Sequence, residues 1–301
     1  MTDNLHMSPD EFRRRGHQMV DWVADYLDNI EEYPVNSQVK PGAIRAALPD
    51  AAPEHPDDFA DVMTDLDEII MPGVTHWQSP HWYAYFPANS SGPSLLGEMA
   101  AAGLGVQGML WSTSPAATEL ETVVVDWMVD LLDLPQTFKT TGPGGGVIQM
   151  SASDSTLVAL VTARDRLSSA VPIDRLVVYA SDQTHSSLEK GARIAGYSNV
   201  RSIATDEHFA LDMAALTGTV NQDKAAGLTP AFVAATIGTT ATTAVDPIRE
   251  IAQLARDEGM WCHVDAAYAG SAMICPEFRH HQDGIELVDS YTFNPHKWML
   301  T

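Results

Sequence analysis

The sequence contains few basic residues and few cysteines. Its 301 residues include 17 lysines and arginines against 40 aspartates and glutamates, for a formal charge of −23. Because nucleic-acid binding depends on lysine and arginine contacts to phosphates, we expect no nucleic-acid partner, and an anionic membrane surface is equally unfavourable. The two cysteines, Cys262 and Cys275, are too few for a disulfide framework.

Long hydrophobic runs are also missing. The longest apolar stretches are interrupted by Asp126, Asp130 and Asp133, so none approaches the length needed to cross a bilayer. Residues 1–10 lack the basic start and the apolar centre of a signal peptide. We therefore expect a cytoplasmic protein with no membrane partner, and we predict no metal site.

The composition that remains is that of a globular protein. Hydrophobic residues make up 45% of the chain, which is enough to bury a sizeable core. Residues 1–85 are predicted to form an N-terminal helical segment and a linker, ahead of a large domain over residues 86–301. Ser8 and Pro9 mark a helix start, and apolar residues then recur at helical spacing. One short helix is expected in the linker, at 43–48.

From residue 94 onward, short apolar runs alternate with helical patterns, which predicts a doubly wound α/β fold with a mostly parallel sheet. The predicted strands are 147–150, 176–180, 200–204, 232–236, 261–264 and 291–293. The predicted helices are 94–103, 116–132, 153–168, 186–195, 212–223 and 247–258.

Two residues that follow predicted strands indicate a particular chemistry. Asp265 and Lys297 come after the runs 260–264 and 290–293, and ligands of open parallel sheets lie beyond the carboxyl ends of the strands. A lysine can hold pyridoxal phosphate as a Schiff base, while a carboxylate keeps the pyridine nitrogen protonated so that the ring can accept electrons. Asp265 and Lys297 are therefore predicted to form a pyridoxal-phosphate site.

A phosphate site is predicted where the helix at 153–168 begins. The glycine-rich segment 142–146 and the run 147–150 lead to Ser151, Ala152 and Ser153. Backbone N–H groups at a helix N-terminus, with two hydroxyls beside them, suit a phosphate. The alternative is a simple glycine loop, because the segment lacks the Gly-Lys-Ser/Thr ending of a nucleotide-binding loop.

Two other predicted strand ends carry candidate ligands. His185 follows 176–180, where an imidazole could stack on the cofactor ring and contact a substrate carboxylate; the alternative is a histidine that caps the next helix. Thr239 and Thr240 follow 232–236 and offer hydroxyls, or else form a simple turn. Because several strand ends would converge with Asp265 and Lys297, we favour one common site.

Six motifs in the same order resemble the group II pyridoxal-phosphate-dependent decarboxylases, above all those acting on aromatic L-amino acids. The motifs are 85–87, 114–121, 145–153, 181–187, 263–270 and 294–298. The resemblance runs over almost the whole chain. It implies a large domain of the pyridoxal-phosphate-dependent transferase type, known as fold type I.

The resemblance implies a role for each matching residue. Lys297 would be the Schiff-base lysine, Asp265 the partner of the pyridinium, and His185 the residue stacked on the ring. The phosphate segment is matched by Ser151, Ala152 and Ser153. Further cofactor contacts are matched by Thr240, Ala267, Asn294 and His296. The substrate pocket, which suits an aromatic side chain, would be lined by Trp77, Tyr85, Phe86 and Pro87, together with His185.

The reaction implied is decarboxylation of an aromatic L-amino acid to an arylalkylamine and carbon dioxide. Ala88, Gln107 and Met109 depart from the animal enzymes and leave the ring substituents of the substrate open. Two other interpretations stay open. One is an aromatic aldehyde synthase, in which oxygen takes part, and the other is a truncated, non-catalytic paralogue.

The resemblance also bears on the size of the protein. It implies further strands and a smaller C-terminal domain after the lysine motif, which a chain that stops at Thr301 would lack. Members of the family form dimers with the active site at the interface. We therefore expect a homodimer in which Phe12, Val23 and Leu27 are buried between the subunits.

Overall fold

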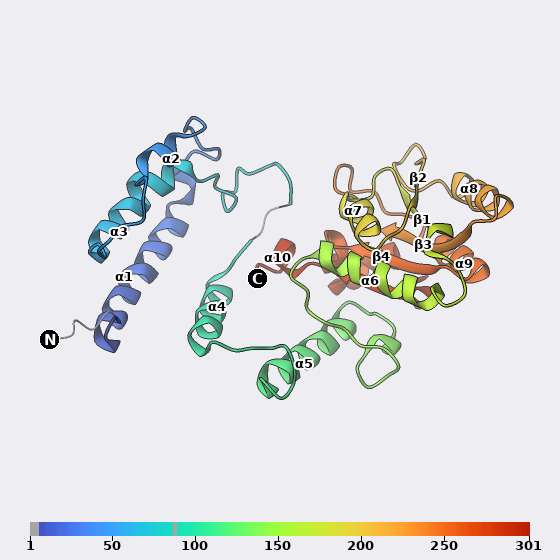
Figure 1. The fold of residues 1–301 in the computed structure, drawn as a ribbon, viewed down its shortest axis with the longest axis horizontal. Helices are drawn as coiled ribbons and strands as arrows, with labels where there is room; N and C mark the ends of the chain where they lie inside the picture. The colour runs from blue at the N-terminus through green and yellow to red at the C-terminus, as the bar shows by residue number, and fades with distance from the viewer. Residues whose placement is uncertain (1–5, 87–88) are drawn as a thin grey trace. The chain divides into compact units, whose positions relative to one another are not determined.

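The computed structural model describes residues 6–86 and 89–301, and the chain divides into two compact units, Met1–Asn89 and Ser90–Thr301 (Figure 1). Each unit has its own internal packing. No helix among the described residues combines the length and the apolar character that a membrane crossing requires.

The N-terminal unit consists of helices. Helix α1 (Pro9–Asp28) begins at Ser8, whose side chain accepts the backbone N–H of Glu11, as the proline and acids of its first turn predict. The predicted short helix is present as α2 (Ala43–Ala47). Helix α3 (Phe59–Asp65) was not predicted; it continues into a π-helical turn, Leu66–Ile70. Two 3-10 turns complete the unit, Ile30–Glu32 and Met71–Gly73.

Polar contacts tie α1 to the later part of this unit. The indole N–H of Trp22 donates to Asp67 at 2.8 Å, and the Tyr26 hydroxyl lies 3.0 Å from Nδ1 of His76. The ring of Tyr33 stacks on His76 with 4.9 Å between ring centroids. His76 is buried, and this burial lowers the pKa of its imidazole. A neutral histidine therefore joins the two halves of the unit.

The C-terminal unit is a three-layer α/β structure around one parallel sheet. The strands are β1 (Leu176–Ser181), β2 (Asn199–Ile203), β3 (Thr229–Thr236), β4 (Trp261–Ala266) and β5 (Ser290–Phe293). Their order in the sheet is β2-β1-β3-β4-β5, and all pairs are parallel. The connections from β1 to β2 and from β2 to β3 run in opposite directions, so the sheet is doubly wound, as predicted.

Helices cover both faces of the sheet. The helices of this unit are α4 (Gly92–Leu104), α5 (Pro115–Leu131), α6 (Ala152–Leu167), α7 (Ser187–Ile194), α8 (Met213–Ala225), α9 (Ile248–Glu258) and α10 (Pro295–Trp298). Helices α6 and α7 pack on one face, against Val178, Phe232 and Ala234. Helices α8 and α9 pack on the other face, against Val233 and Val264.

The predicted strand at 147–150 is wrong. These residues run as an irregular segment without strand pairing, and Val147, Ile148 and Met150 are 62%, 65% and 95% exposed. The backbone N–H of Ile148 donates instead to the Glu121 carboxylate at 2.7 Å. An apolar run forms a strand only where a neighbouring strand accepts its backbone hydrogen bonds, and no described strand lies beside this one.

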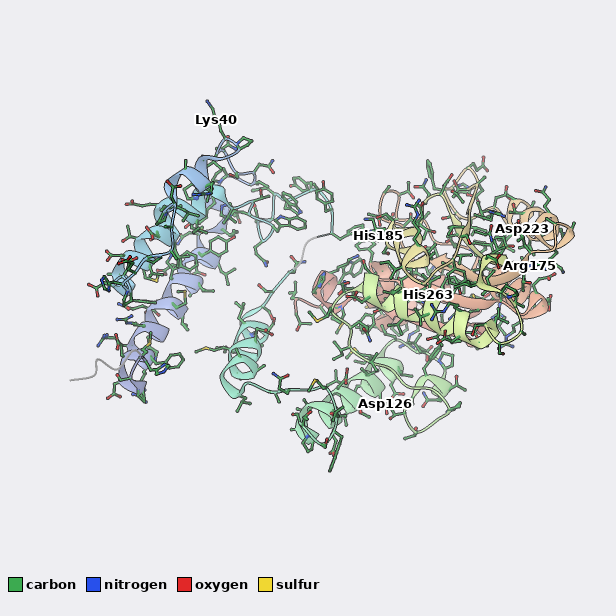
Figure 2. The ribbon with its side chains drawn as sticks, viewed as in Figure 1. Lys40, Asp126, Arg175, His185, Asp223 and His263 are labelled. Atoms are coloured by element: carbon green, nitrogen blue, oxygen red, sulfur yellow. The ribbon has the colours of Figure 1, made fainter. Side chains whose placement is uncertain are left out.

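A buried ion pair lies on the β1–β2 side of the sheet. Arg201 donates to both carboxylate oxygens of Asp223, with a shortest distance of 2.7 Å, and the Tyr179 hydroxyl donates to the same carboxylate at 3.1 Å. Figure 2 labels Asp223 at the opposite side of the unit from His185. This pair therefore joins β1, β2 and α8 without taking part in the predicted site.

Replacing Asp223 with alanine should lower the free energy of unfolding by about 3 kcal/mol, because the Arg201 guanidinium would lose its carboxylate in a partly buried position. Tyr179→Phe should lower it by about 1 kcal/mol, since one hydrogen bond is lost. Urea denaturation measures both. Asp10→Ala, which removes an exposed pair with Arg13, is the control and should leave the midpoint unchanged. Equal midpoints for Asp223→Ala and the control would contradict this role.

Candidate active site

Asp265 and Lys297 lie at the carboxyl ends of neighbouring strands. Asp265 is the last residue but one of β4 and pairs with Thr292 of β5. Lys297 lies in α10, which begins two residues after β5 ends. Asp265 is 8% exposed, and its carboxylate accepts the backbone N–H of Ala267 at 3.0 Å. This bond orients the carboxylate at the end of the strand.

The charge of Lys297 depends on this location. The lysine is half-buried, and burial lowers the pKa of its ammonium group, while the negative charge of Asp265 opposes that shift. The two side chains are therefore close enough to interact electrostatically. Such a lysine loses its proton more readily than an exposed one, as a nucleophilic amine requires.

The first turn of α6 lies at the same edge of the sheet. Figure 1 shows α6 beginning on the side of the unit where α10 lies, and α6 contacts β3, β4 and β5. Ser151 is the N-cap: its hydroxyl accepts the N–H of Asp154 and donates to the Asp154 carboxylate at 2.9 Å. The Ser151 hydroxyl is thus occupied by the cap. Ala152 and Ser153 have the N–H groups that a helix start leaves without an intrahelical carbonyl.

The glycine-rich segment ahead of α6 is shaped by packing. A Cβ atom on Gly144 would lie 2.3 Å from the carbonyl oxygen of Thr137, and one on Gly146 would lie 2.3 Å from Cγ1 of Val125. Thr140 is bound through its N–H and hydroxyl to the carboxylate of Asp126 on α5. These glycines permit close contacts within the loop, which a simple glycine loop requires, and the phosphate site at 151–153 stays a prediction.

His185 lies between β1 and α7 and caps that helix. Its Nδ1 accepts the backbone N–H of Ser187 at 3.2 Å and lies 2.8 Å from the Ser187 hydroxyl. Because Nδ1 accepts this N–H, a neutral ring carries its proton on Nε2. The His185 side chain is exposed, and Figure 2 shows it toward the strand-end side of the unit. Capping and ligand contact use different ring nitrogens, so the two interpretations of His185 are compatible.

The other candidate cofactor contacts surround the same strand ends. Thr240 is exposed at the tip of the turn after β3, whereas Thr239 is buried and its hydroxyl accepts the N–H of Ala244 at 3.0 Å. The Asn294 amide lies 3.3 Å from Nε2 of His296, at the start of α10. Burial, and then the charge of Lys297, lowers the pKa of His296. Of the two candidate threonines, Thr239 and Thr240, Thr240 is therefore the one that is open to a ligand.

Apart from His185, the predicted substrate residues belong to the N-terminal unit. The rings of Trp77, Trp82 and Tyr85 stack on one another, and the Trp77 and Trp82 centroids are 4.8 Å apart. Tyr85 is 77% exposed and has a φ of 57°, which is uncommon for a residue with a side chain. Phe86 is half-buried. Pro87, and Ala88 beside it, lie outside the described residues.

One group of polar residues near Asp265 was not predicted. His263 is 1% exposed and lies on the same face of β4 as Asp265. Its Nδ1 lies 2.8 Å from the hydroxyl oxygen of Ser290, which also accepts the indole N–H of Trp261 at 2.7 Å. Sequence reasoning included His263 in a motif without giving it a role. The available signal was a polar residue two positions before the aspartate, where strand periodicity places it on the aspartate's side.

Fold and site together define a doubly wound α/β protein with a lysine and a carboxylate at neighbouring strand ends. A model of the pyridoxal-dependent decarboxylase conserved domain matches residues 41–301. The chain belongs to the pyridoxal-dependent decarboxylase family.

Several relatives are similar over nearly all of this chain. It is 51% identical to phenylacetaldehyde synthase of Arabidopsis thaliana, over 98% of this chain and 62% of that protein. It is 48% identical to aromatic-L-amino-acid decarboxylase of Rattus norvegicus, over 98% of this chain and 64% of that protein. The crystal structure of Catharanthus roseus tryptophan decarboxylase in complex with L-tryptophan matches with a TM-score of 0.96 and 47% identity, over 99% of this chain and 65% of that one. The chain thus spans less than two thirds of these relatives.

Lys297 should react with acetic anhydride at a lower pH than an ordinary lysine, because its lowered pKa leaves more neutral amine at each pH. Mass spectrometry of peptides labelled across a pH series gives the midpoint, with the exposed Lys190 as the internal reference. Asp265→Asn should lower the Lys297 midpoint further, since the anion that favours the charged form is removed. A Lys297 midpoint at or above that of Lys190 would show that the predicted shift is absent.

Proposed function

We propose that this chain catalyses pyridoxal-phosphate-dependent decarboxylation of an aromatic L-amino acid, giving the arylalkylamine and carbon dioxide. The observation that carries the proposal is the placement of Asp265 and Lys297 at the ends of β4 and β5, where the lowered pKa of Lys297 and its interaction with Asp265 suit a lysine that binds a carbonyl cofactor. Family membership supports the same cofactor.

The residues present fit the parts of pyridoxal phosphate. The buried carboxylate of Asp265 would face the ring nitrogen, and the N–H groups of Ala152 and Ser153 would hold the phosphate at the start of α6. The exposed imidazole of His185 would cover the ring. Lys297 would carry the covalent link. The remaining proposed contacts come from Ser151, Thr240, Ala267, Asn294 and His296.

Each of these residues would have a definite task in the reaction. When bound, pyridoxal phosphate takes up the electrons of the breaking bond between Cα and the carboxylate. Asp265 would keep the proton on the ring nitrogen through charge pairing in a buried position. The Nε2–H of His185 would bind the substrate carboxylate, because Nδ1 is already used in the cap. The amine of Lys297 would also be placed to transfer protons nearby.

An aromatic substrate is supported by the aromatic cluster of the N-terminal unit. Trp77 and Tyr85 stack with a centroid distance of 5.8 Å and remain partly exposed, and such rings favour an aromatic ligand. We propose that Trp77, Tyr85, Phe86 and Pro87 contribute to binding the aromatic side chain of the substrate. The relatives named for tyrosine and tryptophan support the same substrate class.

Lys297→Ala should abolish covalent capture of the cofactor. In the wild-type chain loaded with pyridoxal phosphate, borohydride should fix the cofactor to the peptide that contains Lys297, as found by mass spectrometry. The matched control Lys190→Ala removes an exposed lysine on α7 and should leave that labelling unchanged. Labelling of the Lys297→Ala chain equal to that of wild type would show that another lysine holds the cofactor.

An aromatic aldehyde synthase is the second candidate, favoured by the 51% identity to phenylacetaldehyde synthase. That reaction consumes one molecule of O2 and one molecule of water per amino acid. It releases the aldehyde, carbon dioxide, ammonia and hydrogen peroxide. Incubation with phenylalanine, tyrosine, tryptophan and dihydroxyphenylalanine therefore separates the two candidates: amine alone supports the decarboxylase, whereas aldehyde with ammonia and peroxide supports the synthase. Absence of both products would favour the non-catalytic paralogue.

We also propose a cytoplasmic homodimer. Both cysteines are free, as is usual for reducing compartments. Helix α1 has no buried residue; Phe12 is 60% exposed, while Val23 and Leu27 are half-buried. Such an apolar stripe is suited to a partner helix.

The chain should elute as a dimer at micromolar concentration, and Phe12→Glu should shift it toward the monomer because a charge would be buried in the interface. Size-exclusion chromatography with light scattering gives the mass directly. Arg13→Gln, which changes the charge of the exposed neighbouring residue by the same one unit, is the matched control. A wild-type monomer at that concentration would contradict the proposal.

A further inference from the structure

Beside Asp265, the structure contains a hydrogen-bonded series of buried polar groups. At the end of the series, Nε2 of His263 has no hydrogen-bond partner among the described residues. Trp261 and His263 lie on the same face of β4, and Ser290 pairs with His263 on β5. The indole N–H of Trp261 donates to the Ser290 hydroxyl oxygen at 2.7 Å, and the same oxygen lies 2.8 Å from Nδ1 of His263. The series thus leads along β4 toward Asp265.

The protons of this series can be assigned from its donors. An indole N–H can only donate, so the Ser290 oxygen accepts from Trp261. The contact between the Ser290 hydroxyl and Nδ1 of His263 can run in either direction, depending on the tautomer of the ring. We assign the Ser290 proton to Nδ1, because this gives the hydroxyl an acceptor. A neutral imidazole that accepts at Nδ1 carries its proton on Nε2. Burial lowers the pKa of His263, which keeps the ring neutral.

The Nε2–H of His263 takes no part in these hydrogen bonds. It is fully buried and has no hydrogen-bond partner among the described residues, and the hydroxyl of Thr236 is in the same condition. Thr236 pairs with Asp265 across β3 and β4, so both side chains lie on one face of the sheet, which is also the face of His263. Residues two apart on a strand are about 7 Å apart along it. Two unused donors therefore flank one carboxylate.

The surroundings leave few other partners for these donors. The same face of the sheet is apolar around them, with Ala234 and Phe232 under α6. The ring of His263 packs against that of Phe232, with 5.8 Å between centroids. Figure 2 labels His263 within the body of the C-terminal unit, whereas His185 lies toward its edge. Burial lowers the pKa of His263, and the negative charge of Asp265 opposes that shift, so the two groups lie close enough to interact.

We propose that His263 is a positioning residue for Asp265: its Nε2–H, fixed by Trp261 and Ser290, holds the Asp265 carboxylate, together with the Thr236 hydroxyl, in the orientation that faces the cofactor ring nitrogen. The contact is made directly after a small side-chain rotation or through one bound water, which three polar groups can hold. The cofactor part of this role rests on the proposed function, whereas the coupling of His263 to Asp265 does not. His263 touches neither cofactor nor substrate.

The coupling can be tested on the chain without ligand. In protein labelled with ¹⁵N-histidine, the signals lost in His263→Gln identify His263. They should show a neutral ring with the proton on Nε2, and Asp265→Asn should shift the Nε2–H signal because its acceptor has changed. A proton on Nδ1, or an Nε2–H signal that is the same in Asp265→Asn and wild type, would overturn the inference.

The consequence for the cofactor is tested by rescue. His263→Leu introduces an apolar side chain of similar size without a donor and should weaken pyridoxal phosphate binding about tenfold, as loss of an outer partner of a ligand residue typically does. His263→Gln keeps an N–H near the Nε2 position and should stay within about threefold of wild type. Val178→Ala is the control, because it creates a cavity in β1 on the same face of the sheet but far from Asp265. It should lower stability and leave the dissociation constant for pyridoxal phosphate unchanged.

The outcomes separate the two ideas. Equal affinity of His263→Leu and wild type would overturn the positioning role, and so would equal weakening by His263→Leu, His263→Gln and Val178→Ala, because that pattern reflects packing alone. If the wild-type chain fails to bind pyridoxal phosphate at all, the proposed function fails, and the histidine signals still decide whether His263 is coupled to Asp265.

Discussion

The parallel pairing of β4 with β5 is the constraint on which the site depends. Its register places Asp265 beside Thr292 and brings α10, with Lys297, to the end of the neighbouring strand. Because side chains alternate along a strand, a slip of one residue would turn Asp265 toward the opposite apolar layer and Val264 toward the site. The backbone hydrogen bonds of this pair therefore determine the distance and direction between the two groups that the proposed chemistry needs.

Burial changes the pKa values of these groups and strengthens the electrostatic interactions between them. Asp265, His263 and Thr236 occupy a polar strip within an apolar layer that α6 covers. Charges and dipoles interact more strongly there than in water. The same burial lowers the pKa of Lys297 and of His263, so that a lysine that loses its proton more readily and a neutral imidazole both interact with one carboxylate. Burial thus acts both on Lys297, the proposed nucleophile, and on His263, which is proposed to hold Asp265.

Local sequence signals predicted most helices and strands, but they could not show which residues have both a structural role and a proposed ligand-binding role. The alternation of short apolar runs and helical patterns predicted β1 to β5 and α4 to α9 within a few residues. It failed at 147–150, where the apolar run has no neighbouring strand, and it missed α3. Ser151 and His185 were predicted as ligands, and each also caps a helix. Capping hydrogen bonds join residues two or three positions apart, but their geometry exists only once the helix has formed.

The sequence by itself determined the acidic character, the α/β pattern and the residues available for a strand-edge site, because these follow from composition, periodicity and motif order. The tertiary structure decided which of them meet. It placed Asp265 and Lys297 at adjacent strand ends, assigned the glycine-rich loop to packing, and joined Trp261, Ser290 and His263 into one hydrogen-bonded chain. Residues 27 positions apart can share a hydroxyl group only through strand pairing, and no local pattern encodes that register.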